Sequence, residues 1–72
     1  MRLPRYAIYD TFHRVYLLRV ELPTGEAGLT YTLWTRNAAE ALRFPGAKSA
    51  RRMLGQLGAR DAVIINGRGV KL

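Results

Sequence analysis

The chain has 72 residues and no cysteine, and its twelve Lys and Arg against five Asp and Glu give a net charge of +7. A chain of this length buries only about 60% of the surface that its unfolded form exposes, so we expect one domain with a thin core and no deep enzyme cleft. The lack of cysteine excludes disulfides and thiolate zinc sites and favours a reducing, cytoplasmic environment. The apolar runs are far too short to span a membrane.

The first half of the chain predicts three strands with short connections. Residues 5–10 are rich in aromatic and aliphatic side chains. Residues 15–22 form the strongest strand, which we expect at the centre of the sheet, and residues 29–34 alternate apolar and polar side chains as the chain returns. Residues 23–28 hold a proline and two glycines, the composition of a hairpin loop. Three strands joined by short loops predict an antiparallel meander.

Strict alternation along these strands predicts which face of the sheet each side chain occupies. Tyr16 and Val20 share one face, and Tyr31 belongs with them, so we expect these side chains under a covering helix. Trp34 would then lie with Thr32 on the open face. An open aromatic face with nearby arginines is one way in which small modules stack single-stranded bases.

Helical spacing is confined to the stretch after Trp34. Thr35 is predicted to cap a short helical turn at about residues 36–42, and Pro45 ends that turn. The main helix is predicted at about residues 46–57, with Gly58 just past its end in a left-handed conformation. Its apolar stripe consists of Ala47, Ala50, Leu54 and Leu57.

Residues 61–66 predict a last strand, in which the run Val63, Ile64, Ile65 favours burial on both faces and so a position inside the sheet or beside its centre. Residues 67–72 are expected to form a short tail or frayed strand end. One main helix on one face of a mostly antiparallel, three- to four-stranded sheet gives an α+β fold in the order β-β-β-α-β. The pattern leaves open which strand the last one pairs with.

No constellation of side chains predicts catalysis. His13 is the single histidine, and we expect it to be a solvated turn residue near Asp10. Ser49 has no glycine-flanked elbow, and the five carboxylates are scattered one to an element. The segment Asn66–Gly69 resembles a phosphate loop but no helix follows it. We therefore expect no enzyme activity, no cofactor and no metal.

Positive charge is concentrated in the second half of the chain, where Asp61 is the only acidic residue after position 40. Together with Trp34, these basic residues are the candidate binding residues for a protein partner or a nucleic acid. They are Arg43, Lys48, Arg51, Arg52, Arg60, Arg68 and Lys71. A solvated basic face without a ligand is the alternative.

Over residues 6–57 the chain resembles a pattern found in small phage- and prophage-encoded proteins. The shared features are an opening strand YAIYD, the pair Trp34-Thr35, Ala41, Phe44 and a helix that includes Ala50. The chain departs from that pattern at Pro45-Gly46, where a serine or threonine cap and an acidic first turn are usual. Lys48 and Arg51 place basic side chains there instead, which favours the binding of an external anion near the helix start.

The resemblance implies a non-enzymatic binding protein of mobile-element type. We expect it to occupy an acidic or nucleic-acid-binding surface of a larger partner, as inhibitors of host defence complexes such as anti-CRISPR proteins do. The first alternative is direct nucleic-acid binding through the basic helix and the aromatic sheet face, with no membrane involved. The second is a structural module or homodimer that pairs through an exposed edge strand, either the first or the third.

Overall fold

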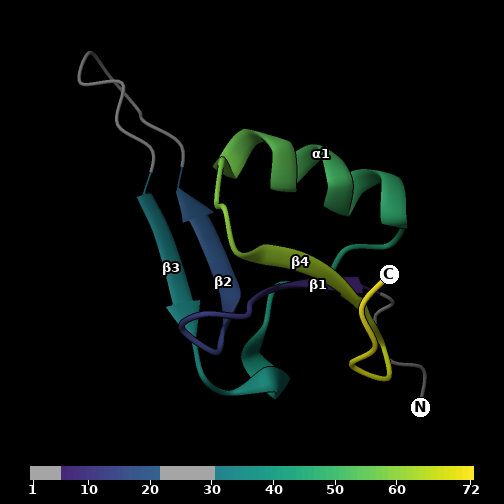
Figure 1. Ribbon diagram of the computed structural model, residues 1–72, viewed down its shortest axis with the longest axis horizontal. Helices are drawn as coiled ribbons and strands as arrows, with labels where there is room; N and C mark the ends of the chain where they lie inside the picture. Colours follow the sequence, from purple (N-terminus) through teal and green to yellow (C-terminus); the bar gives the residue numbers. More distant parts are fainter. Residues whose placement is uncertain (1–5, 22–30) are drawn as a thin grey trace.

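The computed structural model describes residues 6–21 and 31–72, so the predicted hairpin loop at 23–28 and the adjoining strand ends lie outside the described residues. The described ranges form one sheet and one main helix (Figure 1). Their elements are β1 (Tyr6–Asp10), β2 (Val15–Glu21), β3 (Tyr31–Thr35), the 3-10 turn η1 (Ala38–Glu40), α1 (Ala47–Leu57) and β4 (Ala62–Asn66). The strand order is β3-β2-β1-β4, and every neighbouring pair is antiparallel. Since α1 packs on β4 and β1 at one face, the predicted α+β fold is confirmed, with β2 inside the sheet.

β4 occupies an edge of the sheet beside β1, one of the two inner strands, so of the two predicted positions the one inside the sheet is wrong and the one beside its centre fits. The run reflects burial of both faces: Ile64 lies in the cluster under α1 and Ile65 in a second cluster on the opposite face. Residues 67–72 turn back along the outer edge of β4 instead of forming a tail. The Leu72 backbone N–H donates to the Ile64 carbonyl at 2.9 Å, and that of Asn66 donates to the Val70 carbonyl at 2.9 Å.

A β-bulge at Leu18 changes which side chains of β2 face α1. Leu17 pairs with Trp34 and Val20 pairs with Thr32, so β2 advances by one more residue than β3 between these pairs. Leu17 is fully buried in the cluster under α1, and Val20 packs against the same cluster. The alternation of β2 therefore shifts by one residue at the bulge.

The predicted faces of three aromatic side chains are wrong. The shift accounts for Tyr16. Tyr31 and Trp34 lie on β3, which alternates without a bulge and turns its Trp34 face, not its Tyr31 face, toward the helix side. Tyr16 packs against Tyr9 on the face away from α1, with ring centroids 4.8 Å apart. Tyr31 is 61% exposed. Trp34 lies on the helix side of the sheet and packs against its cluster, although α1 itself covers mainly β4 and β1. The prediction that Trp34 lies on the same face as Thr32 is confirmed, since the Trp34 indole N–H donates to Thr32 Oγ1 at 3.2 Å.

The segment between η1 and α1 crosses from one face of the sheet to the other between β1 and β2. These strands pair with each other only beside their connecting loop. Beyond it, the Leu42 N–H donates to the Leu17 carbonyl at 2.8 Å, and Phe44 and Tyr6 exchange two hydrogen bonds of 2.8 and 3.2 Å. Ala41 is buried on the far face and Phe44 in the cluster under α1. The crossing segment thus fills the gap where β1 and β2 diverge.

Both ends of α1 are formed by glycines. Gly46 is an N-cap without a side-chain hydrogen bond, and Gly58 follows the helix with φ 63°, the left-handed conformation that glycine adopts without strain. Ala50 is buried, and Leu54 and Leu57 pack on the sheet, as the apolar stripe predicts.

The turn before the crossing segment is shorter than predicted, and its cap is Asn37 instead of Thr35. Asn37 Oδ1 accepts from the Ala39 N–H at 3.0 Å. The Thr35 hydroxyl instead accepts from the Asn37 N–H at 3.0 Å and donates to Glu40 at 2.9 Å. Thr35 therefore stabilises the backbone just before the turn and does not cap the first free amide of the turn.

Candidate functional site

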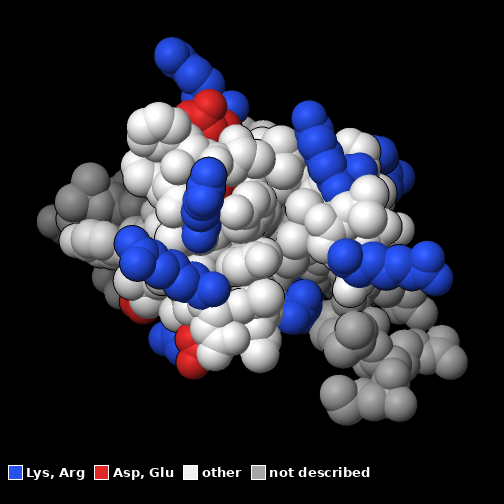
Figure 2. Space-filling model, turned by 60° about the horizontal axis from the view of Figure 1, so that its bottom comes forward, with Lys and Arg blue, Asp and Glu red and all other residues white. Residues whose placement is uncertain are grey.

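The predicted basic binding residues are spread over several elements. Lys48, Arg51 and Arg52 lie on α1, Arg60 in the turn after it, and Arg68 and Lys71 in the C-terminal turn beside β4. These six are exposed, whereas Arg43 is partly buried in the crossing segment and its Nη2 donates to the Ala38 carbonyl at 2.6 Å. Figure 2 shows Lys and Arg side chains separated by uncharged surface. On the face shown, they do not form one dense patch.

None of these cations forms an ion pair with a carboxylate of the described residues. Within residues 6–21 and 31–72, the ion pairs are His13 with Asp10 at 3.0 Å and Arg19 with Glu21 at 3.8 Å. Neither pair includes a predicted binding residue. Exposed cations without internal partners keep their full long-range attraction for anions, screened only by salt.

Two of the predicted cations, Arg51 and Lys71, line the same groove of about 360 Å³ along the outer edge of β4. We call it the β4 groove. Arg52 is not part of it, because consecutive helical residues diverge by about 100°. The rest of the lining is apolar and consists of Leu54, Ala62, Val63, Ile64 and Leu72. An apolar floor therefore lies between positive charges from α1 and from the C-terminal turn.

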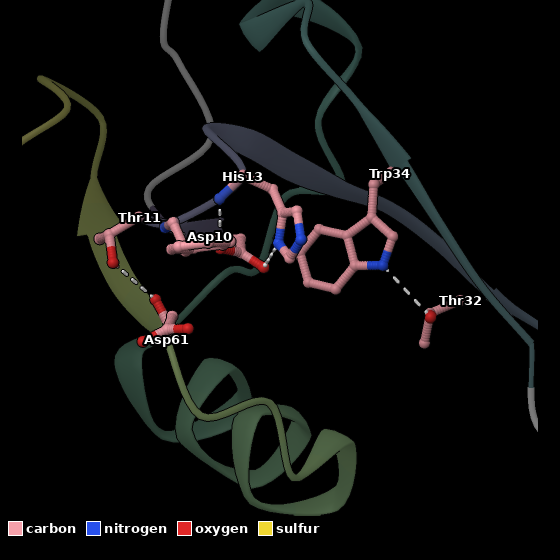
Figure 3. Close-up of polar contacts among 7 residues, drawn as sticks. Asp10, Thr11, His13, Thr32, Trp34 and Asp61 are labelled. Carbon is pink, nitrogen blue, oxygen red and sulfur yellow. Dashed lines mark hydrogen bonds and ion pairs between the residues drawn. The ribbon is translucent and has the colours of Figure 1, made fainter.

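The loop between β1 and β2 is organised by Asp10, whose side chain is only 13% exposed. Its Oδ1 accepts from the backbone N–H groups of Phe12 and His13, at 2.9 Å each, and its Oδ2 lies 3.0 Å from Nδ1 of His13 (Figure 3). These contacts, the backbone hydrogen bond from His13 first and its ring second, lower the pKa of Asp10 below its ordinary value of 3.8. Donation from Nδ1 leaves Nε2 as the acceptor of a neutral ring.

The same loop is tied to the start of β4. The backbone N–H and the hydroxyl of Thr11 both donate to the Asp61 carbonyl, at 3.0 Å each (Figure 3). The Arg14 N–H closes the loop on the Asp10 carbonyl at 2.8 Å, with Arg14 itself in the left-handed region at φ 59°. His13 is thus presented by a hydrogen-bonded loop rather than by an unsupported one.

A cavity of about 420 Å³ opens where this loop meets the end of β3. We call it the aromatic cleft. Asp10 and Val15, which pair across β1 and β2, lie on one side of it, and Trp34 and Arg36 from the end of β3 lie on the other. His13 completes the lining, and its ring points from Asp10 toward the Trp34 indole (Figure 3). The cleft combines an indole, an imidazole held by a carboxylate, and a guanidinium.

Among the lining residues of the aromatic cleft, only Trp34 was predicted from the sequence to be a binding residue, and it was assigned to the wrong face. His13 is exposed at 65%, as expected of a turn residue, but its pairing with Asp10 was not predicted. The spacing of Asp10 and His13 in a polar turn is a signal that could have found it, because an Asp side chain often accepts from backbone amides two or three residues later. Arg36 lies close to the loop between β1 and β2 only because β2 pairs with β3.

No family model, curated protein or solved structure matches the chain. In residues 6–21 and 31–72, no three His, Cys, Asp or Glu side chains gather in a way that could hold a metal ion. Across these same two ranges, no helix combines the length and the hydrophobicity needed to cross a membrane. The β4 groove and the aromatic cleft are the two surfaces on which functional proposals rest.

Proposed function

We propose that the protein is a non-enzymatic binding protein that docks onto an acidic protein surface through its β4 groove. The observation that carries this proposal is the combination of an apolar floor with Arg51 and Lys71 at the rim. The complementary ligand is a partner segment in which an apolar side chain is flanked by carboxylates. The apolar side chain would be buried on the floor, and the carboxylates would meet the two cations.

The shape and chemistry of the groove support a protein partner over the two alternatives. Duplex nucleic acid presents phosphates but no flexible apolar side chain for the floor. A second copy of this chain brings a net charge of +7 and is repelled at a cationic groove. For edge-to-edge dimers, β1 is excluded as an edge because β2 and β4 flank it, which leaves β3.

Blocking follows directly from such docking. A protein of this size that covers an acidic or nucleic-acid-binding surface prevents the natural ligand from reaching it. This is the mode of action implied by the resemblance to small mobile-element proteins, with inhibition of a host defence complex in the manner of anti-CRISPR proteins as its specific form. Long-range attraction by the exposed cations would speed the encounter and make it sensitive to salt.

The test compares two double variants of equal charge. Arg51→Glu/Lys71→Glu reverses the rim of the groove, and Lys48→Glu/Arg68→Glu reverses two exposed cations that do not line it. Each is titrated with a labelled peptide that has one leucine between glutamates, with the same peptide carrying serine for leucine, and with single- and double-stranded oligonucleotides.

The proposal expects binding of the leucine peptide that is lost in the groove variant, largely retained in the matched variant, and weaker for the serine peptide. It is overturned if both double variants weaken the leucine peptide equally, because diffuse charge and not the groove would then hold it. Double-stranded oligonucleotides that bind more tightly than the peptide would make nucleic-acid binding the function. Failure of the leucine peptide to bind the native protein at low salt also contradicts it.

A further inference from the structure

We infer that the aromatic cleft is a binding site for a nucleotide unit, with its base against Trp34 and His13 and its phosphate on Arg36. The inference does not rest on the proposed docking function, because the lining residues of the cleft and of the β4 groove are entirely different. The ligand is either a free mononucleotide or an unpaired nucleotide of a single strand. Both present the same chemistry, an aromatic ring joined to an anion.

The base is accommodated by the aromatic walls. Trp34 is half-buried, backed by the cluster under α1, and its indole N–H is fixed on Thr32, so the ring is already oriented. Val15 adds an apolar contact between the two sides of the cleft. Flat aromatic ligands stack on such rings without regard to base identity, since every base has a π face.

The edge of the base meets the Asp10–His13 pair. The Asp10 carboxylate holds the backbone and the ring of His13 before any ligand arrives, so little ordering is needed on binding. In the neutral form of the ring that donates from Nδ1 to Asp10, Nε2 can accept a hydrogen bond from an exocyclic amine of a base. This pair therefore contributes a polar contact beside the stacking surface.

The phosphate is assigned to Arg36. This residue is exposed at the rim of the cleft, and no carboxylate within residues 6–21 and 31–72 forms an ion pair with it. A guanidinium presents a planar set of donors that matches phosphate oxygens. An uncharged aromatic ligand would leave this cation without a counterpart, so a base that carries a phosphate fits the lining better.

The experiment uses Trp34 as its own reporter, because it is the only tryptophan in the chain. The native protein is titrated with adenosine 5′-monophosphate, adenosine and inorganic phosphate, while the tryptophan fluorescence is followed. Single-stranded and double-stranded oligonucleotides form further arms that distinguish the two sources of the nucleotide. The variants are Arg36→Gln and, as the matched control, Arg52→Gln, an exposed arginine of α1 outside the cleft.

We expect saturable quenching by the mononucleotide, weakened about tenfold in Arg36→Gln, which corresponds to the loss of one charge-assisted contact. Adenosine should bind equally to both variants, and inorganic phosphate should cause no quenching. Tighter binding of the single strand than of the mononucleotide or the duplex identifies a strand as the source. The inference is overturned if the mononucleotide does not quench saturably, or if Arg36→Gln and Arg52→Gln weaken it alike.

Discussion

Leu17 of β2 lies directly opposite Trp34 of β3, one residue before the bulge at Leu18. Leu17 is fully buried, and Trp34 packs against the cluster to which it belongs. Leu17, which fills the core on the helix side, therefore also supports the Trp34 indole that lines the aromatic cleft. Core packing and the orientation of Trp34 are coupled at this pair.

Replacing Leu17 by alanine should destabilise the protein by about 2–5 kcal/mol, because a fully buried leucine leaves a cavity that the core cannot fill completely. That is a large share of the roughly 5–15 kcal/mol expected for a domain. Leu33→Ala on the neighbouring strand, where the side chain is 42% exposed, should cost much less. Urea unfolding followed by circular dichroism measures both. Equal losses would contradict the burial of Leu17.

Deleting Leu18 should leave the fold intact, because the bulge residue is the one that has no partner in the pairing of β2 with β3. Without it, Leu17 and Val20 keep the faces that they have now. Deleting Val20 instead shifts Glu21 onto the buried face and should prevent cooperative unfolding. Two-dimensional amide NMR spectra compare the variants, and loss of dispersion in the Leu18 deletion would argue against the bulge.

The two glycines near the end of α1 should respond to alanine in opposite directions. Gly58→Ala forces a side chain into φ 63° and should cost about 1 kcal/mol or more. Gly55→Ala lies within the helix with open space around the added methyl group, and should stabilise by about 0.5–1 kcal/mol. Thermal unfolding of the pair gives the signs. A gain for Gly58→Ala would exclude the left-handed helix end.

Asp10 should make the protein sensitive to acid. Because its pKa in the folded state is below the ordinary value of 3.8, the unfolded state binds more protons in that range, and the stabilisation present above 3.8 is lost as the pH falls through the folded pKa. Asp10→Asn keeps one side-chain oxygen for the loop amides but removes the charge. Its stability should therefore fall less between pH 7 and strongly acidic pH than that of the native protein.

Asp61→Asn is the control for the change in formal charge, since it is the Asp61 carbonyl, not its side chain, that holds Thr11. Urea unfolding at a series of pH values compares the three proteins. If native protein and Asp10→Asn lose stability in parallel as the pH falls, the hydrogen bonds from His13 to the carboxylate do not persist in solution.

The α+β class and the ends of α1 could be predicted because they depend on local signals, namely alternation, helical spacing and glycines at the helix ends. The face of Tyr16 could not, because one extra residue at Leu18 reverses the alternation of β2 and the composition does not show it. The face of Trp34 could not, because alternation along β3 separates two faces but does not say which of them lies on the helix side. The edge position of β4 was missed for a related reason: an apolar run reports burial of two faces and not the number of neighbouring strands.

The candidate sites depend on contacts between distant segments. Arg51 and Lys71 share a groove because residues 67–72 fold back along β4. The pair Asn66-Gly67 indicates a turn, but it does not indicate that the chain returns along β4. Arg36 reaches the loop of His13 through strand pairing. The basic residues themselves could be read directly from the chain, but which of them share a surface could not.

The crossing segment has a consequence for the order of folding events. Its partners are far away in sequence, Leu17 for Leu42 and Tyr6 for Phe44, and it can enter only while the diverging parts of β1 and β2 are apart. Contacts of long sequence separation form slowly, because the entropy of closing a large loop is lost before they stabilise the chain. We therefore expect β1 and β2 to join along this segment only after β2 and β3, whose paired residues lie closer in sequence, have paired.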